Sequence, residues 1–319
     1  MKLVLAEGAL LERILDNTYP IWNEGLSRQA YGQWNAAQLR TPWGHDRLHR
    51  FALLDEHGDV LASAKRYRHD VRVGDRNGWM CGIGAVFTPE PRRGRGHASV
   101  LVERMIEEAS REGALVAGLF SEIGTDFYAR LGFFRVPMDE VTVQVTRAKG
   151  SPAVLVRAGV DRDYPAICAL YNRRSRDAMF TLRRDPDAFH YAITKKRLFA
   201  GLSAAGSRQV EFFVAEEGAT AVAYVVLSQN QFGWTLEEAG DRDPANARVG
   251  AMLQVLVARE PSIELPLIRA WWPPTFAVPP QLSLSRRTNP ADIFMLRPLA
   301  DVPLPTDAKD VFYWRSDYF

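Results

Sequence analysis

Residues 89–109 read PEPRRGRGHASVLVERMIEEA, and this stretch decides how the first half of the chain folds. Three arginines and two glycines lie within residues 92–96, and a helical pattern over 97–112 follows directly, ended by Gly113. A glycine-rich turn before a helix leaves backbone N–H groups without internal partners, and the helix dipole adds positive potential at the same point. Because three neighbouring arginines repel one another, the stretch predicts a site for a phosphate or pyrophosphate anion.

The spacing of this loop differs from two common phosphate-binding patterns. A Walker loop needs a lysine after its second glycine, and a dinucleotide fingerprint needs a third glycine; neither is present. The residues that remain fit R-x-x-G-x-A, with Arg93, Gly96 and Ala98 at the defined positions. Glycines at 94 and 96 allow backbone angles, and a close approach of a ligand, that other residues resist. A solvated basic turn is the alternative interpretation of the loop by itself.

The composition narrows the class of protein. The chain has 319 residues, 47% of them hydrophobic and 24% charged, which is typical of a globular protein long enough for two domains. Basic residues outnumber acidic ones by 20 to 19 in 1–150 and again in 151–319, so neither half has the excess of a nucleic-acid-binding surface. The N-terminus resembles neither a signal peptide nor a membrane span, and two cysteines make no disulfide framework. We therefore expect a cytoplasmic protein without a nucleic-acid or membrane partner.

The expected elements come in an order that repeats once. The first half is expected to contain a helix over 8–27 broken at Pro20, and then these elements: a hairpin at 51–54 and 60–67, a strand after the turn signal at Asn77 and Gly78, the helix 97–112, a strand at 114–120, a short helix ended by Gly132 and a closing strand at 140–145. The polar segment 146–154 predicts a linker. A similar order in the second half indicates an internal duplication, with domains over 1–148 and 153–319.

The loop resembles the pyrophosphate loop of the GNAT superfamily of acyl-CoA-dependent N-acyltransferases, written R/Q-x-x-G-x-G/A. The superfamily also has a Phe-Tyr pair and a Gly-Phe pair about thirty residues after this loop, and their counterparts here are Phe127-Tyr128 and Gly132-Phe133. The segment 118–133, GLFSEIGTDFYARLGF, is similar to the enhanced intracellular survival group, whose members are tandem acetyltransferases with a loop-less second copy. The resemblance covers most of 1–145 and implies an α/β fold with mixed sheets. Two tandem GNAT-like domains follow from it, the first catalytic and the second degenerate.

The resemblance implies acetyl-CoA as cosubstrate and assigns its binding residues. The diphosphate would lie on the loop and first helical turn, at Arg93, Gly94, Arg95, Gly96, His97, Ala98 and Ser99. In the family the strand before the loop splays from the strand after the helix, and the pantetheine arm lies in the gap. The backbone of Val86, Phe87 and Thr88 would then face the pantetheine amides.

Transfer to an amine requires a base, stabilisation of the oxyanion and an acid for the leaving thiolate. Removing a proton from an amine of pKa ~10.4 costs about 4.6 kcal/mol at pH 7. Tyr128 is the expected general acid, and a tyrosine whose ring only fills the space under the helix is the alternative. For the base, Glu122 follows the strand 114–120, although it could equally cap the next helix. The resemblance offers the terminal carboxylate at Phe319 as a second candidate.

Other reactive residue types have simpler explanations. Cys81 lies in an apolar strand, where a buried inert thiol is expected. His45 and His49 have the spacing of two metal ligands on a helix, but Pro42 and Gly44 favour a loop there, and we expect no metal site. The aromatic segment between the first helix and the hairpin is expected to wall the acceptor pocket or to pack in the core; it contains Trp22, Tyr31, Trp34 and Trp43.

The expected function is therefore acetyl transfer to the amine of a small molecule, an aminoglycoside-like acceptor by resemblance, within the first of two lobes. The second half contains no R-x-x-G-x-G/A pattern, so we expect it to hold no acyl-CoA. A non-catalytic acyl-CoA sensor and an acetyltransferase of the mycothiol-synthase type are the alternatives. The oligomeric state, a homo-oligomer included, stays open.

Overall fold

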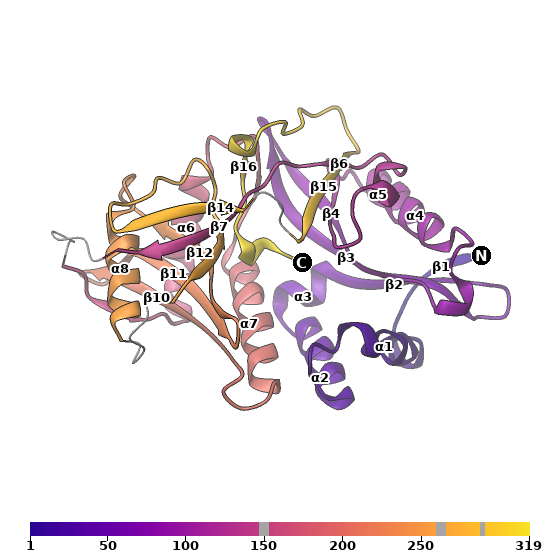
Figure 1. Ribbon diagram of the computed structural model, residues 1–319. Coiled ribbons are helices and arrows are strands. Elements are labelled where there is room, and N and C mark those ends of the chain that lie inside the picture. The colour runs from indigo at the N-terminus through magenta and orange to yellow at the C-terminus, as the bar shows by residue number, and fades with distance from the viewer. Residues whose placement is uncertain (147–152, 260–265, 288–290) are drawn as a thin grey trace. The chain divides into compact units, whose positions relative to one another are not determined.

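The computed structural model describes residues 1–146, 153–259, 266–287 and 291–319 (Figure 1). These residues form two compact units, each with its own core. The first unit comprises Met1–Pro137, Ala291–Thr306 and Phe319, and the second comprises Met138–Pro290 and Asp307–Tyr318. Most of the linker expected at 146–154 lies outside the described residues.

The first unit is built on one mixed sheet. Its strands follow the order β1-β2-β3-β4-β5-β15-β6, in which β4 and β5 are parallel and every other neighbouring pair is antiparallel. The strands are β1 (Lys2–Leu5), β2 (Leu48–Leu54), β3 (Val60–Val73), β4 (Arg76–Phe87), β5 (Val116–Ser121), β6 (Phe134–Arg135) and β15 (Ile293–Pro298). The helices are α1 (Gly8–Trp22), α2 (Arg28–Leu39), α3 (Pro42–Arg47), α4 (His97–Arg111) and α5 (Asp126–Ala129).

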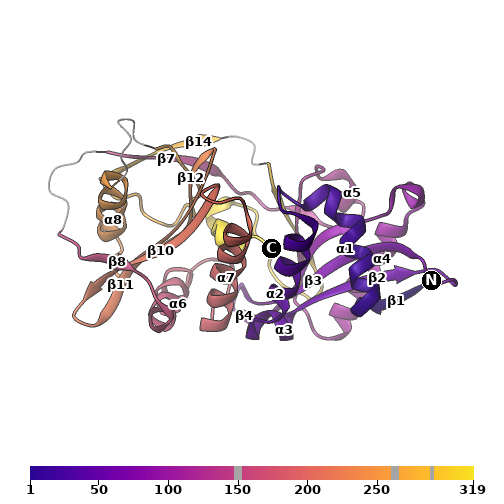
Figure 2. The same ribbon diagram turned by 90° about the horizontal axis from the view of Figure 1, so that it is seen from below.

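Helices cover the two faces of this sheet differently. One face carries α4, whose apolar stripe, including Leu101 and Met105, packs against Ala62, Cys81 and Leu119. The stripe forms because apolar residues recur at helical spacing. The other face carries α1, α2 and α3, which lie beneath the strands in Figure 1 and in front of them in Figure 2. The side chains of one strand therefore alternate between the α4 face and the α1–α3 face.

Three local predictions for this unit were wrong. Residues 42–47 form α3 rather than a loop, because Pro42 is tolerated at the first helical position and Thr41 caps the helix by accepting a hydrogen bond from Gly44 N at 3.0 Å. The first helix ends at Trp22 and keeps Pro20 in its last turn instead of breaking there. The turn before β4 lies between Val73 and Arg76, so the Asn-Gly pair belongs to the strand.

The second unit contains a second mixed sheet, of order β14-β7-β13-β12-β11-β10-β8, and a short parallel pair of β9 with β16. Its strands are β7 (Glu140–Val145), β8 (Val156–Ala158), β9 (Phe180–Leu182), β10 (Arg208–Glu217), β11 (Thr220–Asn230), β12 (Gly233–Asp241), β13 (Ile268–Trp271), β14 (Leu282–Arg287) and β16 (Val311–Phe312). Its helices are α6 (Tyr164–Arg174), α7 (Pro186–Leu202) and α8 (Ala247–Ala258).

Strand β7 departs from the expected domain limits. The sequence pattern placed residues 140–145 at the close of the first domain, but β7 pairs with β13 and β14 in the second unit. In turn β15, from late in the chain, pairs with β5 and β6 in the first unit. Alternation of apolar residues identifies a strand but does not choose its partner, because any sheet with one buried face accepts the same pattern.

The two sheets have the same order of strands. Read from the first edge, β1-β2-β3-β4-β5-β15-β6 matches β8-β10-β11-β12-β13-β7-β14, with the single parallel pair at the fourth and fifth positions in both. In each case one helix, α4 or α8, connects the parallel pair. The mixed α/β class with two mixed sheets is as expected, and the shared order supports an internal duplication.

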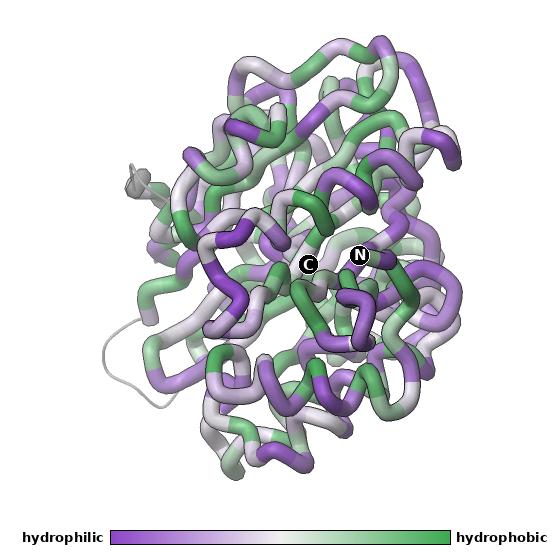
Figure 3. The backbone as a smooth tube through the Cα atoms, turned by 90° about the vertical axis from the view of Figure 1, so that its right-hand side faces the viewer, coloured by the Kyte–Doolittle hydropathy of each residue, from purple (hydrophilic) through white to green (hydrophobic). Residues whose placement is uncertain are grey.

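Hydrophobic and hydrophilic residues alternate along the backbone rather than gathering in one long apolar segment (Figure 3). Among the described residues, no helix combines the length and the apolar character that crossing a membrane requires.

Candidate active site

Strands β4 and β5 separate part-way along their length. Their parallel pairing begins at Met80 with Val116 and stops at Ile83 with Leu119, although β4 continues to Phe87. At the same place the register of β3 with β4 shifts, and Ala85 takes a left-handed backbone conformation with φ 49°. This is a β-bulge, which adds one residue to β4 and turns the strand away from its neighbour. The edge of β4 that faces β5 is therefore left unpaired by β5 from Gly84 onward.

The glycine-rich loop leads from the end of β4 into α4. Gly94 and Gly96 have φ of 75° and 78°, and Gly96 is the N-cap of α4 without a side-chain cap. A Cβ at either glycine would meet no heavy atom within 4 Å, so glycine is required for the backbone conformation and not for space within the chain. The first N–H groups of α4, at His97, Ala98 and Ser99, have no partner in the preceding turn of helix, and they point out of its N-terminus.

The three arginines of the loop have different surroundings. Arg92 forms ion pairs with Asp59 at 3.2 Å and Asp55 at 3.6 Å, so its charge is largely matched within the chain. The Nε of Arg93 donates to the carbonyl oxygen of Thr88 at 3.2 Å, which closes the loop onto the end of β4. Arg95 is exposed and forms no ion pair within the part of the chain that the structure describes. Arg93 and Arg95, rather than all three, are therefore available to an anion.

Tyr128 and Glu122 lie beyond the end of β5. Tyr128 belongs to α5, is 7% exposed, and packs edge-on against Phe127 and Phe133. Burial raises the pKa of Tyr128 to about 12, and the negative charge of Glu122 acts in the same direction, which places the two groups near one another. Glu122 is exposed, and the N-cap of α5 is Thr125.

The ring of Phe319 lies on the α1–α3 face of the first unit. It contacts the rings of His69, Tyr67 and Phe120, with centroids 4.8, 5.2 and 5.4 Å away. Two glycines of β4 make room for it. A Cβ at Gly82 would lie 2.9 Å from Cε2 of Phe319, and a Cβ at Gly84 would lie 3.4 Å from its main-chain oxygen. Gly82 in particular leaves space that the Phe319 ring occupies, because a Cβ there would be closer to the ring than ordinary contact allows.

A family model for the acetyltransferase (GNAT) domain matches residues 16–136, which include the bulge, the loop and α4. This part of the chain is a GNAT acetyltransferase domain. The resemblance found in the sequence is confirmed by this match. No curated protein matches the sequence.

Solved structures share the fold over most of the chain. A GCN5-related N-acetyltransferase from Anabaena variabilis superposes with a TM-score of 0.69 at 13% identity, over 94% of this chain and 73% of that chain. A GCN5-related N-acetyltransferase from Kribbella flavida gives 0.63 at 18% identity, over 93% and 71%. Eis1 from Mycobacterium abscessus gives 0.57 at 13% identity, over 94% and 74%. At these identities the likeness establishes the fold alone, and it extends beyond the residues that the family model matches.

Sequence reasoning found the loop of the GNAT domain but missed the residues on its α1–α3 face. Tyr67, His69, Gly82 and Gly84 were not singled out. Neither was Arg50 of β2, which directly precedes the apolar run FALL at 51–54. The available signal was a charged residue in phase with Leu48 and Ala52, on the strand face where apolar residues are expected. For the bulge at Ala85 no signal was available, because alanine gives no indication of a left-handed conformation.

The remaining candidates of the GNAT domain have structural explanations. Burial raises the pKa of the Cys81 thiol to about 12, which makes it an unreactive core side chain. His45 lies in α3 with its Nδ1 2.6 Å from Asp46, whereas His49 belongs to β2. Among the described residues, no group of three or more candidate ligands could hold a metal ion. Tyr31 and Trp43 are buried on the α1–α3 face.

In the second unit a carboxylate occupies the helix end that corresponds to the loop. Asp241, fully buried at the end of β12, accepts hydrogen bonds from the backbone N–H of Arg248 at 2.9 Å and of Val249 at 3.4 Å. It also forms an ion pair with the Arg248 side chain at 3.2 Å. The N-terminus of α8 is therefore satisfied by an anion of the chain itself. The sequence indicated only that the glycine loop was missing.

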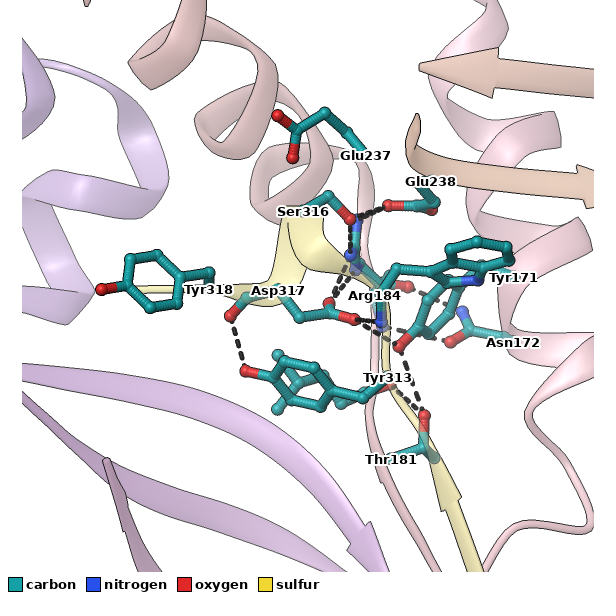
Figure 4. Close-up of polar contacts among 12 residues, drawn as sticks. Tyr171, Asn172, Thr181, Arg184, Glu237, Glu238, Tyr313, Ser316, Asp317 and Tyr318 are labelled. Carbon is teal, nitrogen blue, oxygen red and sulfur yellow. Dashed lines mark hydrogen bonds and ion pairs between the residues drawn. The ribbon is translucent and has the colours of Figure 1, made fainter. Parts of the chain in front are cut away.

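The core of the second unit also contains a buried ionic network (Figure 4). Arg184 pairs with Glu238 at 2.8 Å and with Asp317, and it lies over the ring of Tyr171. Tyr224 donates to Glu238, and Trp314 N donates to Asp317 at 2.8 Å. Burial raises the pKa of Glu238, and the neighbouring charge of Asp317 acts in the same direction, while the Arg184 guanidinium opposes the shift. The network fixes the segment around 314–317 within the second unit.

Proposed function

We propose that the first unit transfers an acetyl group from acetyl-CoA to the amine of a small-molecule acceptor. The observation that carries the proposal is the coincidence of the strand separation after Ile83 with the left-handed N-cap at Gly96. The first offers unpaired main-chain groups to the amides of a pantetheine arm. The second offers unpaired N–H groups and a helix dipole to a diphosphate. The two features follow one another along the chain, in the order in which coenzyme A requires them.

The binding residues are those expected from the sequence. The diphosphate would take hydrogen bonds from the N–H groups of residues 97–99, together with the charges of Arg93 and Arg95. The pantetheine would follow the backbone of residues 86–88 beyond the bulge. The oxyanion that forms at the thioester carbonyl would take a main-chain donor from the same edge of β4.

Tyr128 supplies the proton to the departing thiolate. Its raised pKa keeps the phenol protonated throughout the neutral range, so the proton is always present. Phe319 is our candidate for the base. Its main-chain oxygen lies beside Gly84, next to the bulge, and in a chain that ends at Phe319 this oxygen belongs to a carboxylate. Glu122 is the alternative candidate for the base, and it lies near Tyr128, the proposed acid.

Acceptor turnover and coenzyme A binding test these assignments separately. Calorimetry on the full chain is expected to show coenzyme A binding that is unchanged in Tyr128→Phe, while the turnover of amines falls. Unchanged turnover in Tyr128→Phe would contradict its role as the acid. Glu122→Gln, which keeps the shape of the side chain, separates the two bases: it should leave turnover largely intact if Phe319 is the base.

We also propose that the second unit holds no acyl-CoA. The carboxylate of Asp241 already occupies the N-terminus of α8, where a diphosphate would have to displace it. One bound coenzyme A per chain is the expected stoichiometry, and two would contradict the proposal.

A further inference from the structure

Arg50 is a buried arginine of the first unit whose charge has no partner among the residues that the structure describes. It is 6% exposed, and its Nη1 has no hydrogen-bond partner. Within the described residues no carboxylate pairs with its guanidinium, and the titratable groups that act on it are the phenols of Tyr31 and Tyr67, which are neutral in their protonated form. Burial lowers the pKa of Arg50 from its ordinary value, but an arginine stays protonated at neutral pH.

This arrangement is costly for the folded protein. A buried cation is normally paired, because the loss of hydration exceeds what neutral neighbours return. Arg184, a second arginine that is buried within the described residues, faces two carboxylates, as the rule requires. An apolar side chain at position 50 would pack in β2 without this cost. The missing anion is therefore most simply supplied by a ligand.

The position of Arg50 connects it to the proposed active site. Arg50 pairs across the strands with Lys65, and Lys65 pairs with Gly84, so all three lie on the α1–α3 face. Two strand spacings, about 10 Å, separate the backbones of Arg50 and Gly84. The Lys65 ammonium adds a second positive charge and lies 5.4 Å from the centre of the Trp34 ring. The face next to the bulge thus carries two cations and several aromatic rings, with the Phe319 oxygen, our candidate for the base, beside Gly84.

We propose that Arg50 binds a carboxylate carried by the acceptor, so that the acceptor is an amine with an anionic group and not a polycation. This inference rests on the proposed acetyl transfer and narrows its substrate class to amino-acid-like zwitterions. An aminoglycoside-like acceptor, which the resemblance suggested, would bring several positive charges toward Arg50 and Lys65. A planar carboxylate suits the two parallel donors of a guanidinium.

The test compares two amines that differ only in a carboxylate, benzylamine and 4-(aminomethyl)benzoate, with acetyl-CoA as donor. Wild type is expected to prefer the carboxylate amine at least about tenfold in kcat/KM, the scale of one charge-assisted hydrogen-bond pair. Arg50→Met is expected to abolish this preference while it retains activity toward benzylamine. The matched control is Arg68→Met on the opposite face of β3, where Arg68 already lies near Glu112 and over Trp79; it should keep the preference. A preference that survives in Arg50→Met would overturn the inference.

Stability gives an independent readout. Because Arg50→Met removes an unpaired buried charge, the melting temperature of the variant should rise. An arginine with a purely structural role would instead give a less stable variant, or one that fails to fold, and either result would overturn the inference.

Two further experiments distinguish a wrong assignment of the carboxylate from a failure of the proposed acetyl transfer. With succinyl-CoA and benzylamine, a loss of activity specific to Arg50→Met would assign the carboxylate to the acyl donor and overturn the acceptor assignment. If wild type acetylates neither amine, the proposed transfer fails, and calorimetry decides the role of Arg50. Tighter binding of 4-(aminomethyl)benzoate than of benzylamine to the CoA-saturated wild type, lost in Arg50→Met, would support the site, and equal binding would overturn it.

Discussion

Replacing Gly96 by alanine tests the loop most directly. Gly96 has φ 78°, and a Cβ there would meet no heavy atom within 4 Å, so the substitution introduces backbone strain and no collision. A left-handed conformation costs an alanine roughly 1–2 kcal/mol more than a glycine. If the loop keeps its shape, folding bears this cost and the melting temperature falls by about 2–8 °C for a unit of this size. If the loop relaxes, the cost appears when coenzyme A restores the shape, and Kd rises about 5- to 30-fold.

Calorimetry and thermal unfolding together limit the free energy that the Gly96→Ala strain can cost. Calorimetry with coenzyme A and thermal unfolding of the same Gly96→Ala protein should share a total of roughly 1–2 kcal/mol. Gly113→Ala is the matched control, because Gly113 has φ 84° and equally open surroundings at the other end of α4. It should lower stability by a similar amount and leave coenzyme A binding unchanged. If Gly96→Ala changes neither stability nor affinity, or if Gly113→Ala weakens binding as much, the reasoning is refuted.

Three other substitutions probe separate parts of the chain. Tyr128→Phe should reduce kcat by about 10²- to 10⁴-fold with an unchanged Kd for coenzyme A. Because burial raises the pKa of Tyr128 to about 12, ionisation of Tyr128 should not lower the wild-type rate at neutral or mildly alkaline pH. A fall in the wild-type rate in that range that is absent in Tyr128→Phe would contradict the assignment. Gly82→Ala places a Cβ 2.9 Å from the Phe319 ring and should displace that ring, which should lower kcat more than the affinity for coenzyme A. A fully active variant would show that catalysis does not depend on the position of Phe319. Asp241→Ala leaves the α8 N-terminus and the Arg248 side chain without their anion and should destabilise the second unit by about 1–3 kcal/mol in thermal unfolding. If this variant instead binds coenzyme A at a second site, the carboxylate of Asp241 had only blocked a functional binding site.

The local elements of the loop region were predictable because their signals are local. The amphipathic period of α4, its limits near Gly96 and Gly113, and the apolar run of β5 follow from residues within one or two turns of each position. The same holds for Cys81, whose apolar neighbours in the sequence predicted an inert thiol. By contrast α3 was missed although Thr41 and Pro42 form a recognised helix start, because Gly44 was given more weight than the cap.

Residues 89–113 by themselves determined the glycine turn and the helix after it, because backbone angles and helical period are set by neighbours along the chain. The GNAT resemblance needed residues 118–133 as well, with their Phe-Tyr and Gly-Phe pairs. Only the tertiary structure decided which sheet receives β7 and β15 and that β4 bulges at Ala85. It also decided that, among the described residues, Arg92 is paired and Arg95 is not, and that Arg50 lies buried without a counter-charge there. The physical reason is the same for all of these. Strand partners and the surroundings of a charge depend on groups that are distant in sequence and meet only when the chain has folded.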